Sequence, residues 1–167
     1  MKPQDIVILC KILSIGQRDW NQQLLSRELR ISQSEISESL RRSSYAGLLN
    51  LSHGNVYKRN LLDFLVHGIK YVFPSRPGAI VRGIPTAHSA PIMKDFVVTD
   101  DQYVWPASNG FARGQAIAPL YKTVPVACEF DGHLYDLLAL IDVIRVGRVR
   151  EVEEAIAQLE YILQNAH

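Results

Sequence analysis

The chain has 167 residues, of which 47% are hydrophobic and 21% charged. This length gives room for one domain or two small ones, and the composition is typical of a globular protein with a core rather than of a disordered chain. No stretch approaches the ~20 apolar residues of a membrane helix. The two cysteines, Cys10 and Cys128, lie far apart and outside any paired motif. We therefore expect a cytoplasmic protein with buried thiols, no metal, no cofactor and no membrane contact.

The net charge of +1 conceals an uneven distribution of charged residues. Lys and Arg outnumber Asp and Glu by 9 to 5 in residues 1–60, whereas residues 124–167 hold 3 basic and 8 acidic residues. The basic N-terminal part and the acidic C-terminal part of the sequence indicate an N-terminal half that binds a polyanion and a C-terminal half with a different role.

Three helices are expected at the front of the chain. Apolar positions over 3–15 repeat with a helical period, with a proline near the start and a glycine after the end, where these residues suit helix boundaries. A second helix is expected at about 21–29. The third, at about 33–45, begins after Ser32, whose hydroxyl can accept a hydrogen bond from the backbone N–H of Glu35. The Glu35 carboxylate can reach back to complete a reciprocal capping box.

A β-hairpin and a fourth helix are expected next. Residues 49–58 are predicted as strand, turn and strand, because Gly54 and Asn55 can supply positive φ between two β-prone runs. Residues 60–71 return to a helical pattern that ends before two prolines, which break helices. The first structural unit is therefore expected to close here.

The chain is expected to divide into a domain of residues 1–73 and a region of residues 74–167. Residues 73–91 hold several prolines, which disfavour helix and central strand alike and predict a loop or an extended crossing segment. Two apolar stripes separated by Gly147 predict two antiparallel helices at the end of the chain. The predicted fold is α+β, with a small α/β region before those helices and short strands at 96–99, 102–105 and 124–130.

The stretch Leu25–Leu49, LSRELRISQSEISESLRRSSYAGLL, resembles the helix-turn-helix of the MarR-type and related winged-helix regulators. More loosely, the resemblance extends over about 75 residues, with the hairpin as the wing. Ser26 stands where a small Ala commonly packs and Arg30 where a Gly commonly turns, and an exposed turn tolerates Arg at modest cost. The resemblance implies a bacterial-type transcriptional regulator, in particular a dimeric repressor, rather than an enzyme.

The resemblance places the helix at about 33–45 in the major groove of double-stranded DNA. Arginines there can pair with guanine edges or phosphates, a glutamine suits adenine, serines suit phosphate oxygens, and a glutamate needs a cytosine N4 donor. The candidate contacts of this helix are its outward positions Gln33, Ser34, Ser37, Glu38, Arg41 and Arg42. The wing would add backbone or minor-groove contacts from His53, Asn55, Lys58 and Arg59.

A homodimer is expected, because one such module reads only a few base pairs. The first helix and the two terminal helices would form the dimer surface, or else belong to the core of the single chain. Arg76 and Arg82, which lie within two residues of Gly78 and Gly83, are candidates for a further anion or DNA contact, or else anchor the crossing segment.

Other chemistry finds less support. His88, Cys128 and His133 lack metal-ligand spacing, and Cys128 is expected as a buried thiol in a strand, without an orienting partner for catalysis. An alternative interpretation starts from the same front half, which is similar to the winged helix of autoregulating antitoxins from toxin–antitoxin and phage-defence operons. That similarity implies a C-terminal half that binds a toxin-like protein partner, and the acidic tail suits a basic one.

Overall fold

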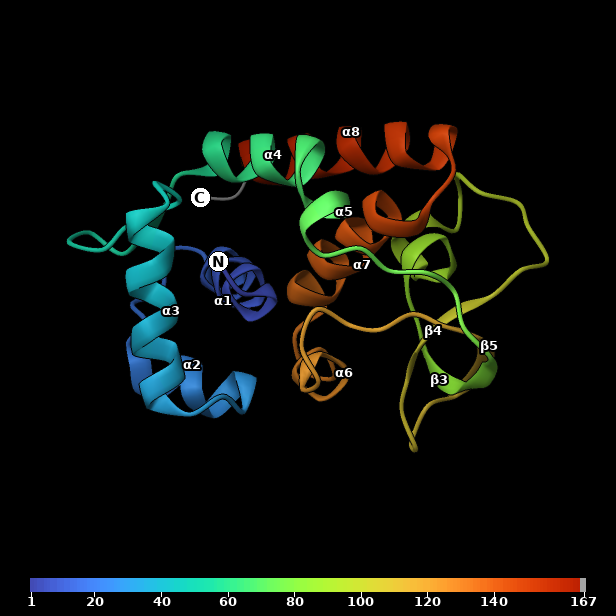
Figure 1. Ribbon diagram of the computed structural model, residues 1–167, viewed down its shortest axis with the longest axis horizontal. Coiled ribbons are helices and arrows are strands. Elements are labelled where there is room, and N and C mark those ends of the chain that lie inside the picture. The colour runs from blue at the N-terminus through green and yellow to red at the C-terminus, as the bar shows by residue number, and fades with distance from the viewer. Residues whose placement is uncertain (166–167) are drawn as a thin grey trace.

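A computed structural model of the protein describes residues 1–165. Figure 1 shows α3 and a small hairpin at one end of the long axis, strands β3 to β5 at the other, and α1 and α7 between them. The fold is of the α+β class, as expected. The elements in chain order are α1 (Pro3–Ile15), α2 (Gln22–Leu29), α3 (Gln33–Tyr45), β1 (Leu49–Asn50), β2 (Asn55–Val56), α4 (Lys58–His67), α5 (Ile69–Val72), β3 (Ile80–Pro85), the 3-10 turns η1 (Ala87–Ser89) and η2 (Pro91–Met93), β4 (Tyr103–Pro106), β5 (Ala112–Ala116), α6 (Val124–Ala127), α7 (Gly132–Val146) and α8 (Val149–Asn165).

The first helix, α1, forms the centre of the N-terminal half. Nine of its residues are buried, and the run from Ile6 to Leu9 is completely inaccessible to solvent. It packs against α2 and α3 on one side and against α7 on the other. These contacts lie within one chain. Of the two alternatives for α1, core of the single chain or dimer surface, the structure therefore fits the first.

The hairpin β1–β2 pairs Leu49 with Val56 and Asn50 with Asn55. Its turn occupies residues 51–54, and only Gly54 has positive φ, at 69°. The hairpin prediction is therefore confirmed, but the turn lies earlier than expected, because Asn55 belongs to the second strand.

Strands β3, β4 and β5 form a small sheet in which each strand pairs with both others. β3 is antiparallel to β4 and to β5, and β4 is parallel to β5. Within residues 73–91, for which a loop or an extended crossing segment was expected, residues 80–85 are extended but form the paired strand β3, so the expectation that prolines exclude such a strand is wrong. Its only proline, Pro85, is its last residue, where the missing N–H costs no hydrogen bond inside the strand.

Two further strand predictions are wrong. Residues 96–99 form no strand, and residues 124–130 contain the short helix α6 followed by a turn. The strand β5 was not predicted, because the sequence ARGQA contains none of the β-branched and aromatic residues that are typical of strands. The two antiparallel helices at the end of the chain are confirmed as α7 and α8, which pack against each other.

Buried hydrophobic side chains from both halves of the chain form one cluster. The halves meet where α1 packs on α7 and where α4 packs on α8. A buried charge reinforces the first contact: Lys11 Nζ lies 2.6 Å from Asp131 Oδ2 and 2.7 Å from Glu28 Oε2. Asp131 also accepts from the N–H of Leu134 and so caps α7. The division at residue 73 stays a prediction.

A second buried polar cluster joins the sheet to α7. The Asp142 carboxylate accepts from Thr86 Oγ1 at 2.7 Å, from Trp105 Nε1 at 2.6 Å and from Arg145 at 2.7 Å. Arg145 further donates to the carbonyl of Phe73. Two of these hydrogen bonds join the sheet region to α7: those from Trp105 in β4 and from Thr86, which directly follows β3, to Asp142. Within residues 1–165, no helix combines the length and the apolar character needed to cross a membrane.

Candidate nucleic-acid interface

Helix α3 has one buried and one polar, exposed side. Ile36 and Leu40 pack inward with at most 2% of their surface exposed. In Figure 1 the helix lies at one end of the molecule, where the hairpin also projects. Its outer side carries most of the expected contact residues in accessible positions: Gln33, Ser34, Glu38 and Arg41 are exposed and Ser37 is half-buried.

The turn between α2 and α3 is stabilised locally. Arg30 ends α2 in the left-handed conformation with φ 53° and is exposed to solvent. Ser26 Oγ donates to the carbonyl of Ile31 at 2.6 Å, which satisfies its hydroxyl. Ser32 Oγ then accepts from the N–H of Glu35 at 3.3 Å and begins α3. These bonds set the angle between the two helices.

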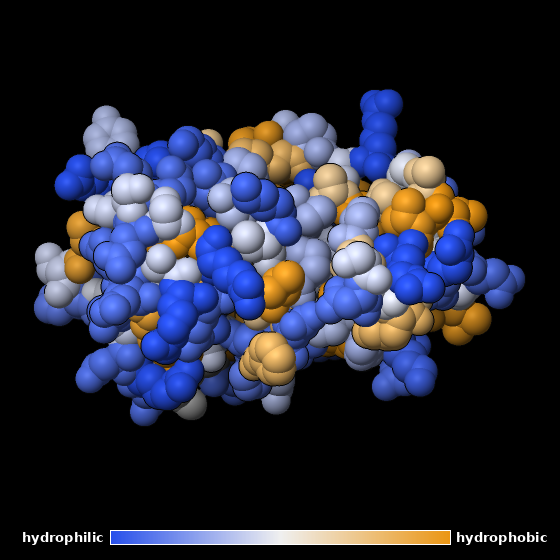
Figure 2. Space-filling model, turned by 90° about the horizontal axis from the view of Figure 1, so that it is seen from below, coloured by the Kyte–Doolittle hydropathy of each residue, from blue (hydrophilic) through white to orange (hydrophobic). Residues whose placement is uncertain are grey.

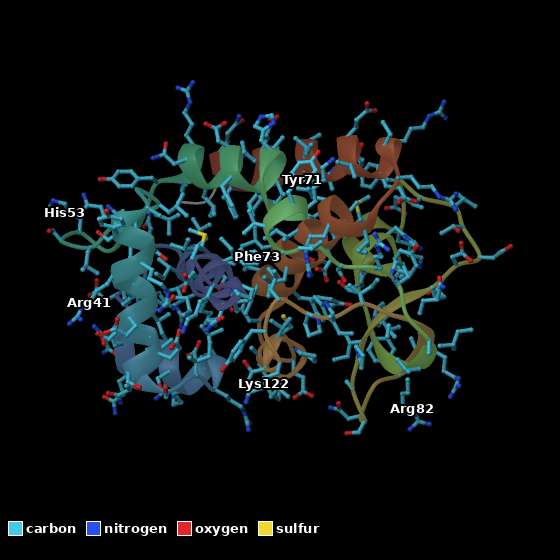
Figure 3. The ribbon with its side chains drawn as sticks, viewed as in Figure 1. Arg41, His53, Tyr71, Phe73, Arg82 and Lys122 are labelled. Atoms are coloured by element: carbon cyan, nitrogen blue, oxygen red, sulfur yellow. The ribbon has the colours of Figure 1, made fainter. Side chains whose placement is uncertain are left out.

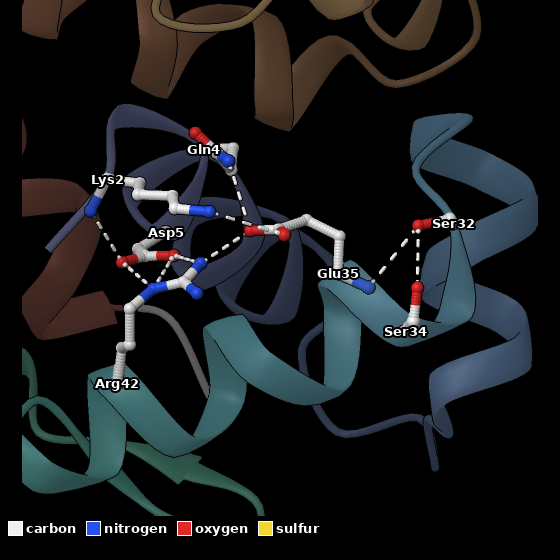
Figure 4. Close-up of polar contacts among 7 residues, drawn as sticks. All are labelled: Lys2, Gln4, Asp5, Ser32, Ser34, Glu35 and Arg42. Atoms are coloured by element: carbon white, nitrogen blue, oxygen red, sulfur yellow. Dashed lines mark hydrogen bonds and ion pairs between the residues drawn. The ribbon is translucent and has the colours of Figure 1, made fainter.

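Arg42 points inward, and the expectation that it lies on the outer side is wrong. Figure 4 shows its guanidinium between Asp5 and Glu35, at 2.7 Å from Asp5 Oδ1 and 2.6 Å from Glu35 Oε1. Glu35 also accepts from Gln4 Nε2 and lies 3.5 Å from Lys2 Nζ. The Glu35 carboxylate therefore serves this cluster, and the predicted return bond of the capping box does not form. Arg42 orients α3 rather than facing outward.

The charges of this cluster stabilise one another. Burial alone raises the pKa of Asp5, but the hydrogen bonds from Arg42 and from the Lys2 N–H outweigh it and hold the pKa below its ordinary value. The hydrogen bond from Arg42 likewise lowers the pKa of Glu35. Both carboxylates are ionised at neutral pH, so Arg42 is neutralised by two negative charges.

Arg41 is the accessible arginine of α3. Its guanidinium is 3.1 Å from Glu38 Oε1, one turn back on the same exposed face. Both side chains are more than half exposed, so water screens this pair and it is easily opened. The Arg41 guanidinium therefore becomes available to another anion when its ion pair with Glu38 opens.

Tyr45, the last residue of α3, is a further candidate contact that the sequence did not single out. Its side chain is 98% exposed. A phenol held free of the core at the end of a polar helix face can donate to a phosphate or a base edge. The helical repeat could have identified it, since position 45 follows Arg41 by four residues on the same face.

The hairpin is fixed to the loop that precedes α2. Trp20 Nε1 donates to the carbonyl of Gly54 at 3.1 Å, and the indole ring lies against this glycine. Of the expected wing contacts, His53, Asn55 and Arg59 are exposed and Lys58 is half-buried. In Figure 3 His53 and Arg41 project from the same end of the molecule.

A groove of about 770 Å³ is lined by residues of the hairpin, of the loop between α1 and α2, and of α1. Its walls include Trp20 and the basic side chains of Arg18, His53 and Lys58, with Asp19 as a carboxylate. The groove therefore adds positive charge beside α3.

The other two expected anion contacts lie elsewhere. Arg76 is exposed in the segment before β3, and Arg82 is exposed within β3. Figure 3 shows Arg82 at the opposite end of the molecule from Arg41. The structure thus brings together the candidates on α3 and the hairpin and separates Arg82 from them.

The two cysteines and His88 are the other candidate reactive side chains, and each is buried or hydrogen-bonded within the fold. Cys10 and Cys128 are buried free thiols, and burial raises the pKa of Cys10 to about 12. Cys128 follows α6, rather than lying in a strand as expected. His88 Nε2 is 2.8 Å from the carbonyl of Asp101. Among residues 1–165, no group of three His, Cys, Asp or Glu side chains has the arrangement of a metal site.

Comparison with known proteins gave no relative: no family model, no curated protein and no solved structure matches the chain.

Proposed function

We propose that the protein is a sequence-specific DNA-binding transcriptional regulator that places α3 in the major groove. The observation that supports this is the two-sided character of α3: an inner row anchored by Ile36, Leu40 and Arg42, and an outer row of polar side chains with Arg41. An α-helix with a polar outer row fits the width of the major groove. Gln33, Ser34 and Arg41 would read bases or bind phosphates there.

The hairpin and its surroundings would extend this contact to the DNA backbone. His53 and Asn55 belong to the hairpin and Arg59 to the first turn of α4, and the groove beside the hairpin includes Arg18 and Lys58 among its lining residues, with Asp19 as a carboxylate. Phosphate contacts position a recognition helix without reading sequence. A dimer, with two copies of α3 on a two-fold operator, would provide the specificity of a repressor.

Fluorescence anisotropy tests this function. The purified chain is titrated against labelled duplex from the region upstream of its own gene, with a scrambled duplex as control, at low and at physiological salt. Arg41→Ala should weaken specific binding about tenfold, as loss of one guanidinium contact does. Arg150→Ala removes an exposed arginine of α8 and serves as the matched control. Equal affinity for both duplexes, or no effect of Arg41→Ala, contradicts the assignment.

A second candidate function is that of an antitoxin-like protein with a partner on its C-terminal half. The outer side of α8 exposes Val149 and Tyr161, at 75% and 65%, together with Glu153 and Glu160. Exposed apolar side chains among carboxylates suit a basic protein. Co-expression with the product of the adjacent gene, followed by size-exclusion chromatography, tests this function. The variant Tyr161→Ser, which alters the proposed surface, is compared with the unmodified chain.

A further inference from the structure

The three-stranded sheet carries a pair of arginines that the proposed function does not use. Of the residues in β3, β4 and β5, only Arg82 and Arg113 are charged. They are direct partners in the antiparallel pairing of β3 with β5, so their side chains leave the same face of the sheet. Both are exposed to solvent.

This arrangement destabilises the sheet unless an anion binds. Like charges directly opposite on neighbouring strands repel each other. On α3, by contrast, Arg42 lies between two carboxylates and Arg41 contacts Glu38. Neither Arg82 nor Arg113 has an ion pair with any residue of the described chain. Two neighbouring guanidiniums are therefore free to bind one anionic ligand.

Apolar side chains flank the two arginines. Phe111 lies two residues before Arg113 and is 80% exposed, and Ile80 lies two residues before Arg82 and is 65% exposed. Ile80 and Arg82 both lie within β3 and therefore share a face of the sheet, whereas Phe111 immediately precedes β5 in the chain. Figure 2 shows blue and orange side chains intermixed at the end of the molecule that holds the sheet. The ligand therefore needs both negative charge and a flat or apolar group.

The pairing of the strands restricts how a ligand binds. Since each of the three strands pairs with both others, the sheet offers no open edge for the addition of a peptide strand. Recognition must then occur through side chains on the outer face. Base stacking on an aromatic ring combined with arginine contacts to phosphates is the usual mode for single-stranded nucleic acid. In a duplex the faces of the bases are already stacked on one another.

We propose that this face is a second nucleic-acid site, which binds a single strand with phosphates on Arg82 and Arg113 and a base on Phe111. The site lies at the opposite end of the molecule from α3, as Figure 3 shows for Arg82. It does not depend on duplex binding by α3, so each site is tested with its own variants.

The test uses the full chain and a fluorescein-labelled oligothymidine of about 20 nucleotides, a length that exceeds one small binding face. Arg82→Glu should weaken anisotropy-detected binding about tenfold or more, and Phe111→Ala about fivefold or more, as loss of one stacked base does. Arg41→Ala should leave oligothymidine binding unchanged. Arg150→Glu, the same charge reversal on α8, is the matched control and should have little effect.

Stability measurements separate loss of binding from loss of structure. Arg82→Glu places opposite charges on β3 and β5, so the melting temperature should stay equal or rise while binding falls. The proposal is overturned if both variants bind oligothymidine like the unmodified chain, or if Arg41→Ala abolishes binding. It is also overturned if duplex DNA competes as well as single strands, or if polyglutamate does, which would indicate an acidic protein as the partner.

Discussion

Arg42 and Asp5 connect α3 to the first turn of α1 through charged hydrogen bonds of 2.7 Å and 3.0 Å. Asp5 is completely buried, and its carboxylate also accepts from the N–H of Lys2 at 2.8 Å. Both ends of the interaction are therefore fixed. The rotation of α3 about its axis follows from this contact, and with it the choice of side chains that face outward.

Replacement of the two neighbouring arginines should change the stability of the protein by very different amounts. Arg42→Met leaves Asp5 buried without its counter-charge and should reduce the free energy of unfolding by about 3 kcal/mol or more. Arg41→Ala removes only an exposed pair and should change it by less than about 0.5 kcal/mol. Urea denaturation measures both. A similar effect of the two substitutions would show that Arg42 does not orient α3.

The stability of the protein should decrease in acid. The pKa values of Asp5, Glu35 and Asp131 are lowered in the folded chain, for Asp5 and Asp131 because hydrogen bonds outweigh their burial. Such carboxylates stabilise the fold fully above their unfolded pKa of about 4, and this contribution is lost as the pH falls through the folded values. Lys11 has a raised pKa, so its contribution is lost only in strong alkali. The free energy of unfolding, measured in urea, should thus be constant near neutrality and fall below pH about 4.

The variant Asp5→Asn provides the control for this pH dependence. It removes one of the titrating groups but keeps a side chain of the same size, so the slope of stability against pH should become smaller below pH about 4. A slope identical to that of the unmodified chain would mean that Asp5 does not contribute.

The buried charge of Lys11 should link the two halves energetically. Its side chain is 5% exposed and its Nζ contacts both Glu28 and Asp131, so Lys11→Met should reduce the free energy of unfolding by about 3 kcal/mol. Asp131→Asn keeps the cap on Leu134 but removes the charge. The double variant should lose less free energy of unfolding than the two single variants lose together, because both substitutions remove the same interaction. Strict additivity in urea denaturation would contradict a direct Lys11–Asp131 contact.

The parts of the fold that the sequence predicted are those with local signals. Helical periodicity, a serine cap and a terminal glycine identify α1, α2 and α3 within one or two residues. The interior of the candidate interface was not predictable in this way. The inward rotation of Arg42 depends on Asp5, which is 37 residues away in the chain, and no local pattern links the two.

The sequence did not predict the sheet correctly, for a related reason. Its strands are stabilised by pairing between distant segments and by the buried Asp142, which accepts from Thr86 and Trp105. Prolines near β3 suggested a loop, although they lie outside the strand or at its last residue. The charged face formed by Arg82 and Arg113 became visible only once the register of the strands was known.

Close approach of the strands predicts a strict requirement for glycine at one position of β3. A Cβ added to Gly83 would overlap the carbonyl of Trp105 in β4 and contact Val104 as well. These are backbone and buried atoms that cannot move without separating the strands, so Gly83→Ala should cost about 2 kcal/mol or more. Gly132→Ala is the matched control, since nothing lies within 4 Å of its added Cβ and Ala favours the start of α7. Thermal denaturation should show a lower melting temperature for the first variant and an equal or higher one for the second. Equal tolerance at both positions would show that β3 and β4 do not pack as closely as the structure has them.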